Sequence, residues 1–343
     1  MQTIATSSII TGIFLSTTLT MFSNNWLLAW LSLELNTFAI LPTISKTKHP
    51  RAIEASTKYF LTQAVASCLL LSSSTINSWQ TGTWDITQMT NNYASTLTFI
   101  ALTMKAGTVP THFWLPEVMQ GSTLPTAMLM ATWQKIAPTS LMLMTANLPP
   151  QNIALTLGLL SMTFGAWGGM NQTQLRKMMA YSSIANMGWT IMVLTSEPKT
   201  SMINILIYIT ILLPTMSIMT LTSTKTLQKM SATWTTSPIA STAMALLLVS
   251  AAGLPPLTGF FPKLLILNEL VTQNLTPTAM LATMASLLSL VFYLRTTHLT
   301  TLLSPPGSAT LTSKWRHTPN KAKMTALTPT ALLTLTALPT IIQ

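Results

Sequence analysis

Charged side chains are nearly absent from long stretches of this sequence, and this limits the folds open to the chain more than any other feature. Only 7% of the 343 residues are charged, while 49% are hydrophobic. A water-soluble protein of this size could hardly cover its surface with so few charges. Serine and threonine are common inside the apolar runs, where their hydroxyls can bond to helix carbonyls four residues earlier. The composition therefore predicts an all-α integral membrane protein.

The apolar runs are long enough to cross a bilayer as helices, which takes roughly 18 to 25 residues. We expect about eleven transmembrane helices within a single membrane domain, residues 1–343. They are predicted at residues 3–22, 26–45, 58–78, 95–116, 124–145, 152–170, 178–195, 201–222, 238–267, 277–294 and 324–341.

The loops between these helices divide sharply by charge when they are assigned alternately to the two sides of the membrane. One side receives thirteen of the seventeen lysines and arginines, and the other receives only Lys199, with Asp85, Glu197 and Glu269. The positive-inside rule then places the N-terminus and the basic loops on the side where the chain is made. The thirteen are Lys46, Lys48, Arg51, Lys58, Arg176, Lys177, Lys225, Lys229, Arg295, Lys314, Arg316, Lys321 and Lys323.

Three lysines and one glutamate remain, and all four fall inside predicted helices: Lys105, Lys135, Lys263 and Glu34. At about 1.5 Å per residue, Glu34 and Lys135 lie roughly 13 to 18 Å deep, near the middle of the bilayer. A lysine so far from either helix end is too short to reach the interface. A purely structural ion pair is an alternative for Glu34 with one lysine, but it leaves two cations without an acid. Because a charge at this depth costs at least about 2.5 to 3.5 kcal/mol, we predict a proton relay.

Two of the predicted helices contain helix-breaking residues beside a buried lysine. The segments are KAGTVPTHFWLPE at 105–117 and GLPPLTGFFPK at 253–263. Proline removes a backbone donor, and broken backbone at bilayer depth is tolerated where protein or a water-filled cavity satisfies the freed groups. A simple proline kink is the alternative at either break. Two breaks beside two lysines favour two discontinuous helices along a hydrated path.

The breaks lie in the fourth and ninth predicted helices, which cross the membrane in opposite directions. This spacing predicts two antiporter-like inverted repeats of five helices, residues 1–145 and 152–294, followed by an additional helix at 324–341. His112 follows the first break. It is either a member of the relay or a donor to the carbonyls that the break frees.

Several chemistries are not indicated. No cluster of Asp, Glu, His or Cys has metal-ligand spacing, no glycine-rich phosphate loop follows a strand, and no Ser-His-acid set is arranged for catalysis. The basic residues are scattered among short loops, which argues against nucleic-acid binding. We therefore expect no cofactor and no metal on this chain. The single cysteine, Cys68, is interpreted as a packing residue.

Five segments of the sequence resemble the antiporter-like membrane subunits of respiratory complex I, NADH:ubiquinone oxidoreductase. Together they sample most of the chain, and one departure is Thr111, where these subunits commonly have phenylalanine. The segments are HPRAIEASTKYFLTQ at 49–63, HFWLPEV at 112–118, WQK at 133–135, NQTQLRKMMAYSSIA at 171–185 and GLPPLTGF at 253–260.

This resemblance implies a subunit of the proton-pumping membrane arm in the mitochondrial inner membrane, with the basic loops facing the matrix. Its partners would be other membrane-arm subunits and lipids such as cardiolipin, while NADH, FMN, iron-sulfur clusters and ubiquinone would bind elsewhere in the complex. The family's roles imply that Glu34 and Lys105 form a coupled pair, that Lys135 links along a central polar axis, and that Lys263 belongs to a second half-channel. A stand-alone cation/proton antiporter and a structural spacer remain as alternatives.

Overall fold

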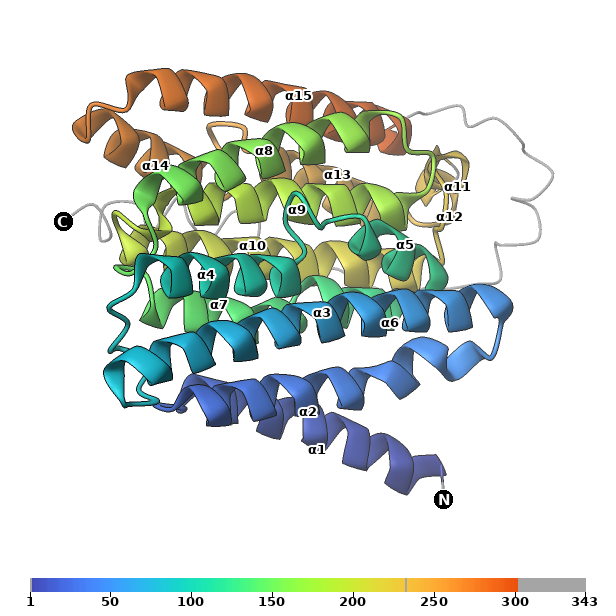
Figure 1. Cartoon of the computed structure of the whole chain (residues 1–343). Coiled ribbons are helices and arrows are strands. Elements are labelled where there is room, and N and C mark those ends of the chain that lie inside the picture. The colour runs from blue at the N-terminus through green and yellow to red at the C-terminus, as the bar shows by residue number, and fades with distance from the viewer. Residues whose placement is uncertain (1, 232, 302–343) are drawn as a thin grey trace. The chain divides into compact units, whose positions relative to one another are not determined.

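The computed structural model describes residues 2–231 and 233–301, and this part of the chain is built from helices (Figure 1). It contains no β-strand within those limits, only two isolated bridges, Asn25 with Asp85 and Gln174 with Thr226. The predicted last helix, 324–341, lies outside the described residues. The all-helical prediction is therefore confirmed for the described part of the chain.

The described residues group into two compact units, which are treated separately. The first comprises Met1–Ser161 with Thr190–Pro198, and the second comprises Met162–Trp189 with Lys199–Gln343, each within the described limits. The helices of the first unit are α1 Gln2–Met21, α2 Trp26–Ile44, the 3-10 turn η1 Ser45–Thr47, α3 Pro50–Thr81, α4 Asn92–Ala106, α5 Trp114–Gly121, α6 Leu124–Ala131, the 3-10 turn η2 Trp133–Lys135 and α7 Ile136–Met144.

Two helices are divided between the units, α8 Gln151–Met170 and α9 Leu175–Leu194, and α10 Pro198–Leu221 belongs to the second unit except for its first residue, Pro198. The later helices are α11 Leu227–Ser231, α12 Thr233–Thr236, α13 Pro238–Ala252, α14 Phe260–Thr272 and α15 Thr276–Thr301. The short helices α11 and α12 occupy a segment for which the sequence predicted only a loop.

Five helices of the described chain are long and apolar enough to cross a membrane by themselves. They are Trp26–Thr47, Pro50–Thr81, Gln151–Met170, Pro198–Leu221 and Thr276–Thr301. Other predicted spans are shorter here because the helix stops partway, as between α4 and α5 and between α13 and α14.

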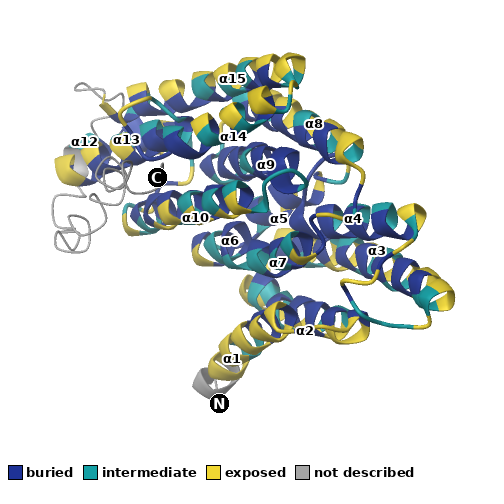
Figure 2. Cartoon of the chain, turned by 90° about the vertical axis from the view of Figure 1, so that its left-hand side faces the viewer, coloured by how far each residue is buried: buried dark blue, intermediate teal, exposed yellow. Residues whose placement is uncertain are grey.

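The helix α2 exposes several leucines, while its buried residues include amides and hydroxyls as well as apolar side chains. Leu28, Leu31 and Leu35 are exposed, whereas Asn36 and Thr37 are buried (Figure 2). A large exposed apolar surface is favourable where lipid is the solvent, and buried amides and hydroxyls then provide contacts between helices. This pattern fits a helix that faces hydrocarbon on one side.

Buried hydroxyls inside the helices bond to carbonyls of their own helices, whereas the buried hydroxyls of Thr195, Ser237 and Thr258, which lie between helices, have no hydrogen-bond partner in the described part of the chain. Ser16 donates to the Ile13 carbonyl at 2.9 Å, and Ser73 donates to the Leu70 carbonyl at 2.8 Å. The acceptor in these helices is most often three residues earlier, one fewer than expected from the sequence. These bonds explain how so many serines and threonines within helices enter the bilayer without an unsatisfied donor.

The predicted continuous helix at 124–145 is wrong in one respect, because the structure divides it at Thr132. The 3-10 turn η2 separates α6 from α7. Pro138 has no N–H to bond the Gln134 carbonyl four residues earlier, and its ring would clash with that carbonyl in a regular α-helix. The tighter turn accommodates this position and, as described below, sets the place of Lys135.

Close helix packing around Gly121 gives a test of the fold of the first unit. A Cβ at Gly121 would lie 2.6 Å from the Ala55 Cβ and 2.7 Å from the Arg51 carbonyl oxygen, whereas a Cβ at Gly12 would lie 3.5 Å from the Ala39 Cβ. We expect Gly121→Ala to destabilise the protein by about 1–3 kcal/mol through overpacking of α5 on α3. Gly12→Ala is the matched control and should leave the unfolding temperature in detergent within about a degree of the parent. Equal unfolding temperatures for both variants would contradict this packing.

Candidate functional site

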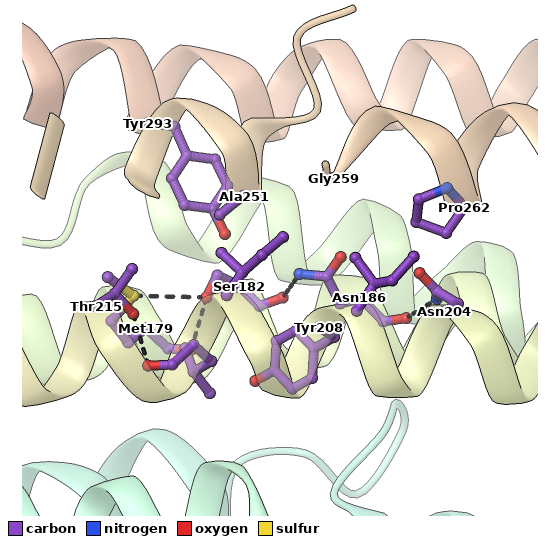
Figure 3. Close-up of a pocket in the computed structure, with 13 residues that line it drawn as sticks. Met179, Ser182, Asn186, Asn204, Tyr208, Thr215, Ala251, Gly259, Pro262 and Tyr293 are labelled. Atoms are coloured by element: carbon purple, nitrogen blue, oxygen red, sulfur yellow. Dashed lines mark hydrogen bonds between the residues drawn. The ribbon is translucent and has the colours of Figure 1, made fainter. Parts of the chain in front are cut away.

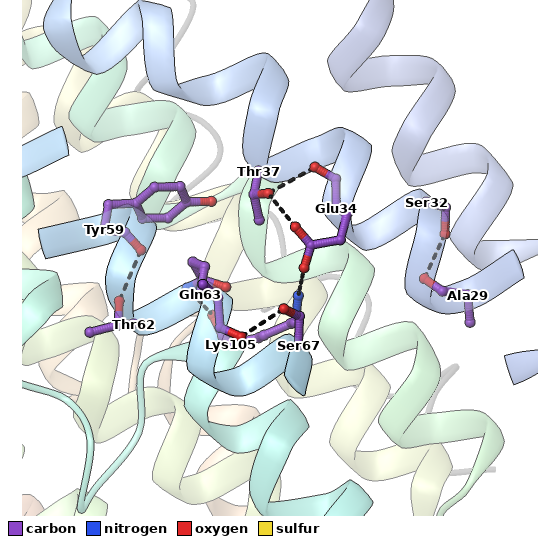
Figure 4. Close-up of polar contacts among 10 residues, drawn as sticks. Ala29, Ser32, Glu34, Thr37, Tyr59, Thr62, Gln63, Ser67 and Lys105 are labelled. Atoms are coloured by element: carbon purple, nitrogen blue, oxygen red, sulfur yellow. Dashed lines mark hydrogen bonds and ion pairs between the residues drawn. The ribbon is translucent and has the colours of Figure 1, made fainter. Parts of the chain in front are cut away.

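Glu34 and Lys105, which are 71 positions apart in the sequence, face each other in the first unit (Figure 4). Glu34 lies near the middle of α2, and its Oε1 is 3.9 Å from Lys105 Nζ. The lysine side chain is 3% exposed and the glutamate side chain 19% exposed. Thr37 donates to the Glu34 backbone carbonyl at 2.8 Å and lies 3.3 Å from its Oε2. The structure therefore brings together the acid and one of the three cations that the charge analysis isolated.

Lys105 lies in the last turn of α4, where the helix presents unpaired carbonyls and the negative end of its dipole. The helix ends because Gly107 adopts φ +79°, and its N–H caps the carbonyls of Thr103 and Met104. Pro110 has no N–H to offer the Ala106 carbonyl. Gln63 on α3 donates to the Lys105 carbonyl at 3.5 Å. The break thus places Lys105 in the last turn of a helix that ends within the predicted span.

Lys135 joins Lys105 in the wall of one small cavity in this unit. The cavity has a volume of about 20 Å³, which is enough for about one water molecule. Lys135 is 3% exposed and ends the turn η2, and Thr139 donates to its backbone carbonyl at 2.7 Å. Two of the buried lysines therefore line the same water-sized cavity.

Neutral polar residues complete this cavity, and the analysis of charges missed them. Asn36 and Gln134 exchange hydrogen bonds through their amides at 2.9 and 3.0 Å. The ring of Tyr59 packs edge-on against Trp114 with centroids 5.6 Å apart, and Gln63 lies on the same wall. Amides inside otherwise apolar helices were the signal that could have identified Asn36, Gln63 and Gln134, since such groups tend to bond to another helix.

His112 is buried between α4 and α5, within the first break. Its ring lies against that of Phe113, with centroids 4.2 Å apart, and it hydrogen-bonds the Pro110 backbone. It is not among the residues that line the cavity between Lys105 and Lys135. The relay and capping roles for His112 both remain predictions.

Lys263 lies in the second unit, in the first turn of α14. Its Nζ donates a hydrogen bond of 2.7 Å to the Ala252 carbonyl, at the carboxyl end of α13. Pro256 is four residues after Ala252 and cannot supply the backbone N–H that an unbroken helix would use there. The lysine ammonium takes the place of that donor. Lys263 is thus held by a carbonyl at a helix end, and no carboxylate among residues 2–231 and 233–301 forms an ion pair with it.

A second small cavity, again of about 20 Å³, lies beside this break (Figure 3). Its polar wall includes Ser182, Asn186, Asn204, Tyr208 and Tyr293, and no acidic or basic side chain lines it. Asn186 donates to the Ser182 carbonyl at 3.0 Å, and Asn204 donates to the Asn186 carbonyl at 3.4 Å. Residues of the break close the cavity, namely Ala251, Gly259 and Pro262. The second unit therefore has a neutral polar cavity where the first has a charged one.

Comparison with known proteins decides the family. Residues 23–289 match the family described as NADH:quinone oxidoreductase/Mrp antiporter, TM. The chain belongs to this antiporter-like family. Its members are integral membrane proteins, which agrees with the spans, the apolar outer faces and the broken helices.

Vertebrate members of the family match the chain almost from end to end. NADH-ubiquinone oxidoreductase chain 2 of Varanus baritji is 49% identical over 329 residues, which cover 95% of both chains. The protein of the same name from Aquarana catesbeiana is 47% identical over 344 residues, covering 100% of this chain and 99% of that one.

A solved bacterial structure shares the antiporter-like fold. A chain of respiratory complex I from Thermus thermophilus superimposes with a TM-score of 0.84 over 96% of this chain and 78% of its own length, at 24% identity. The antiporter-like membrane fold is therefore confirmed for this chain.

The contact between Gly253 and Lys263 can be tested with a matched pair of glycine variants. Gly253 and Gly82 both end helices at positive φ, +85° and +72°, but an added Cβ lies 2.8 Å from Lys263 Nζ at Gly253 and meets nothing within 4 Å at Gly82. Each alanine should cost about 1–2 kcal/mol in backbone strain. Only Gly253→Ala should also displace Lys263 from the Ala252 carbonyl, which a high-resolution map of each variant would reveal. An unchanged lysine position in Gly253→Ala would refute the contact.

Proposed function

We infer that this chain is a proton-translocating subunit of the membrane arm of respiratory complex I, NADH:ubiquinone oxidoreductase. The observation that carries this inference is the buried Glu34–Lys105 pair, 3.9 Å apart, beside a water-sized cavity that Lys135 also lines. The vertebrate relatives, which bear the name NADH-ubiquinone oxidoreductase chain 2, support the assignment over nearly full length. As an enzyme, the chain acts as part of an H⁺-translocating NADH:ubiquinone reductase.

The proposed chemistry is the opening and closing of an ion pair. While Glu34 and Lys105 remain close, their mutual attraction stabilises both charged forms. Separation removes that attraction in a poorly solvated site, so the ammonium group gives up a proton and the carboxylate gains one more readily. Water in the cavity is within reach of both Lys105 and Lys135 and accepts the proton as Lys105 becomes neutral. Lys135, when neutral, accepts it in turn, so each transfer conserves charge.

Lys263 is proposed to serve the second half-channel. Its ammonium group is held by the Ala252 carbonyl, so the lysine can lose its proton without leaving a buried carboxylate unpaired. The neighbouring cavity offers amides and hydroxyls, which orient water for proton transfer without holding a charge themselves. His112 is proposed as an accessory group at the first break.

The architecture is proposed to consist of eleven spans, two of them discontinuous, in which two inverted five-helix repeats (1–145 and 152–294) precede a helix at 324–341. The two breaks support this because α4 and α13 each have 15 residues and end at a glycine of positive φ. In each case seven residues, 107–113 and 253–259, separate that helix from the next. The isolated bridges of the two units also join corresponding loops, the loop after the first helix of each repeat and the loop after its third.

The location and partners follow from the proposed assignment. The basic loops face the mitochondrial matrix, and the chain lies in the inner membrane with other membrane-arm subunits and with lipids such as cardiolipin. NADH, FMN, iron-sulfur clusters and ubiquinone bind in other subunits, so the redox chemistry takes place outside this chain.

Replacement of Lys105 by methionine tests the relay directly. A positioned proton-transfer group typically contributes a factor of about 10² or more. We expect Lys105→Met in the assembled complex to slow NADH oxidation coupled to pumping by at least about tenfold and to lower the ratio of protons to electrons. The control is Lys225→Met, which removes an exposed loop lysine and should change neither quantity. A normal ratio in Lys105→Met would contradict the relay.

A double replacement separates a relay from a structural spacer. Lys135→Met with Lys263→Met removes two buried cations but no exposed one, so the relay predicts normal assembly with pumping abolished. Intact pumping with slowed assembly would instead favour the spacer. Cation/proton exchange by the purified chain alone, in liposomes without any redox partner, would favour a stand-alone antiporter.

A further inference from the structure

An open groove lies in the first unit between the end of α2 and the beginning of α3, which pack side by side (Figure 1). Its volume is about 640 Å³, within the range of about 300–1,000 Å³ that is usual for small-molecule sites. Leu41, Pro42, Phe60 and Leu61 provide its apolar wall. Phe60 is 40% exposed and Leu61 is 63% exposed. The groove therefore offers a large apolar surface that this chain leaves uncovered.

The polar side chains in this groove do not offer free donors to a polar ligand. Ser56 donates to the Ile53 carbonyl at 2.7 Å, and Thr57 donates to the Glu54 carbonyl at 2.9 Å. Ser45 donates to the Leu41 carbonyl at 3.2 Å. With its hydroxyls bonded to its own helices, the groove is suited to a hydrocarbon chain.

Three exposed cations cluster where the groove ends. Lys46 follows the groove residue Ser45 within the turn η1, Lys48 comes two residues later, and Arg51 lies in the first turn of α3. None of the three forms an ion pair within 4.0 Å among the residues that the structure describes. The neighbouring carboxylates of Glu54 and Glu117 both pair with Lys58 instead. Because Lys46, Lys48, Arg51 and Lys58 outnumber the carboxylates of Glu54 and Glu117, this region carries an excess of positive charge.

The groove runs along two helices, so its apolar residues and the neighbouring cations lie at different depths in the membrane. Trp26–Thr47 and Pro50–Thr81 are both candidate membrane spans, and the cations lie where these spans meet: Lys46 at the end of the first, Lys48 in the joining turn and Arg51 at the start of the second. Such a turn lies at the level of the lipid headgroups, while the groove residues lie at the level of the acyl chains. A lipid in this groove would therefore present its phosphate to the cations.

We propose that this groove is a binding site for an anionic phospholipid. One acyl chain packs against Pro42, Phe60 and Leu61, and the headgroup phosphate contacts Lys46, Lys48 and Arg51. A zwitterionic lipid fills the same groove but carries its own cation, which leaves the three basic side chains less well compensated. Each cation near the membrane surface changes the preference for an anionic lipid by about fivefold.

The site can be tested in the complete complex, reconstituted in bilayers that contain trace amounts of photoreactive lipid. Phosphatidylglycerol and phosphatidylcholine, each with a diazirine on the acyl chain, are compared, and labelled peptides are identified by mass spectrometry. We expect phosphatidylglycerol to label residues 41–61 at least tenfold more than phosphatidylcholine does. Equal labelling by the two lipids would overturn the headgroup preference, and no labelling of this segment would show that another subunit fills the groove.

Variants then assign the preference to the basic cluster. A triple variant, with Lys46→Gln, Lys48→Gln and Arg51→Gln, should reduce labelling by phosphatidylglycerol to the level of phosphatidylcholine. The control is Lys225→Gln with Lys229→Gln, which removes two exposed lysines of the second unit and should leave the preference intact. An undiminished preference in the triple variant would contradict the proposal. If that variant fails to assemble, the comparison of the two lipids on the parent complex still decides whether the groove prefers an anionic lipid.

Discussion

The structure depends on giving two of its buried ammonium groups, those of Lys105 and Lys263, a partner that carries negative charge where water cannot supply one. Lys105 has Glu34 at 3.9 Å, and Lys263 has the Ala252 carbonyl at 2.7 Å. The Ala252 carbonyl is free to accept because α13 stops inside the membrane region, whereas an unbroken helix uses its carbonyls internally. Glu34 lies within the continuous helix α2, and the break after α4 lies beside its partner Lys105. The glycines and prolines at the two breaks therefore do more than bend the chain. They supply the electrostatic environment in which a lysine can be buried and still exchange a proton.

The helix breaks of the two units have similar backbones but different charged residues. Lys105 is two residues before Gly107, whereas the matching position before Gly253 is Ala251. Lys263 is ten residues after Gly253, and the matching residue of the first unit is Glu117, which is exposed and pairs with Lys58. As a result the first unit has a carboxylate–ammonium pair, and the second has an ammonium beside a neutral cavity. Under the proposed function, the first holds a pair that can open, and the second offers a route that no buried carboxylate obstructs.

Charge alone was enough to find Glu34, Lys105, Lys135 and Lys263, because an ionised side chain at bilayer depth is costly and therefore rare. Proline and glycine similarly identified both breaks. The turn at 133–135 was missed although Pro138 predicts the loss of one helix bond, since a single proline does not specify whether a helix kinks or tightens. Asn36 and Gln134 were missed for another reason. A neutral amide is inexpensive enough to occur in many helices, so its role depends on which partner the tertiary structure brings to it.

The most direct test of the central claim is a high-resolution map of the assembled complex that resolves water inside the first unit. The account predicts at least one ordered water between Lys105 and Lys135, hydrogen-bonded to at least one of the two ammonium groups, in the cavity that Gln63 and Gln134 also line. A dry cavity filled by a rearranged side chain, with the two lysines directed toward bulk solvent or headgroups, would contradict it.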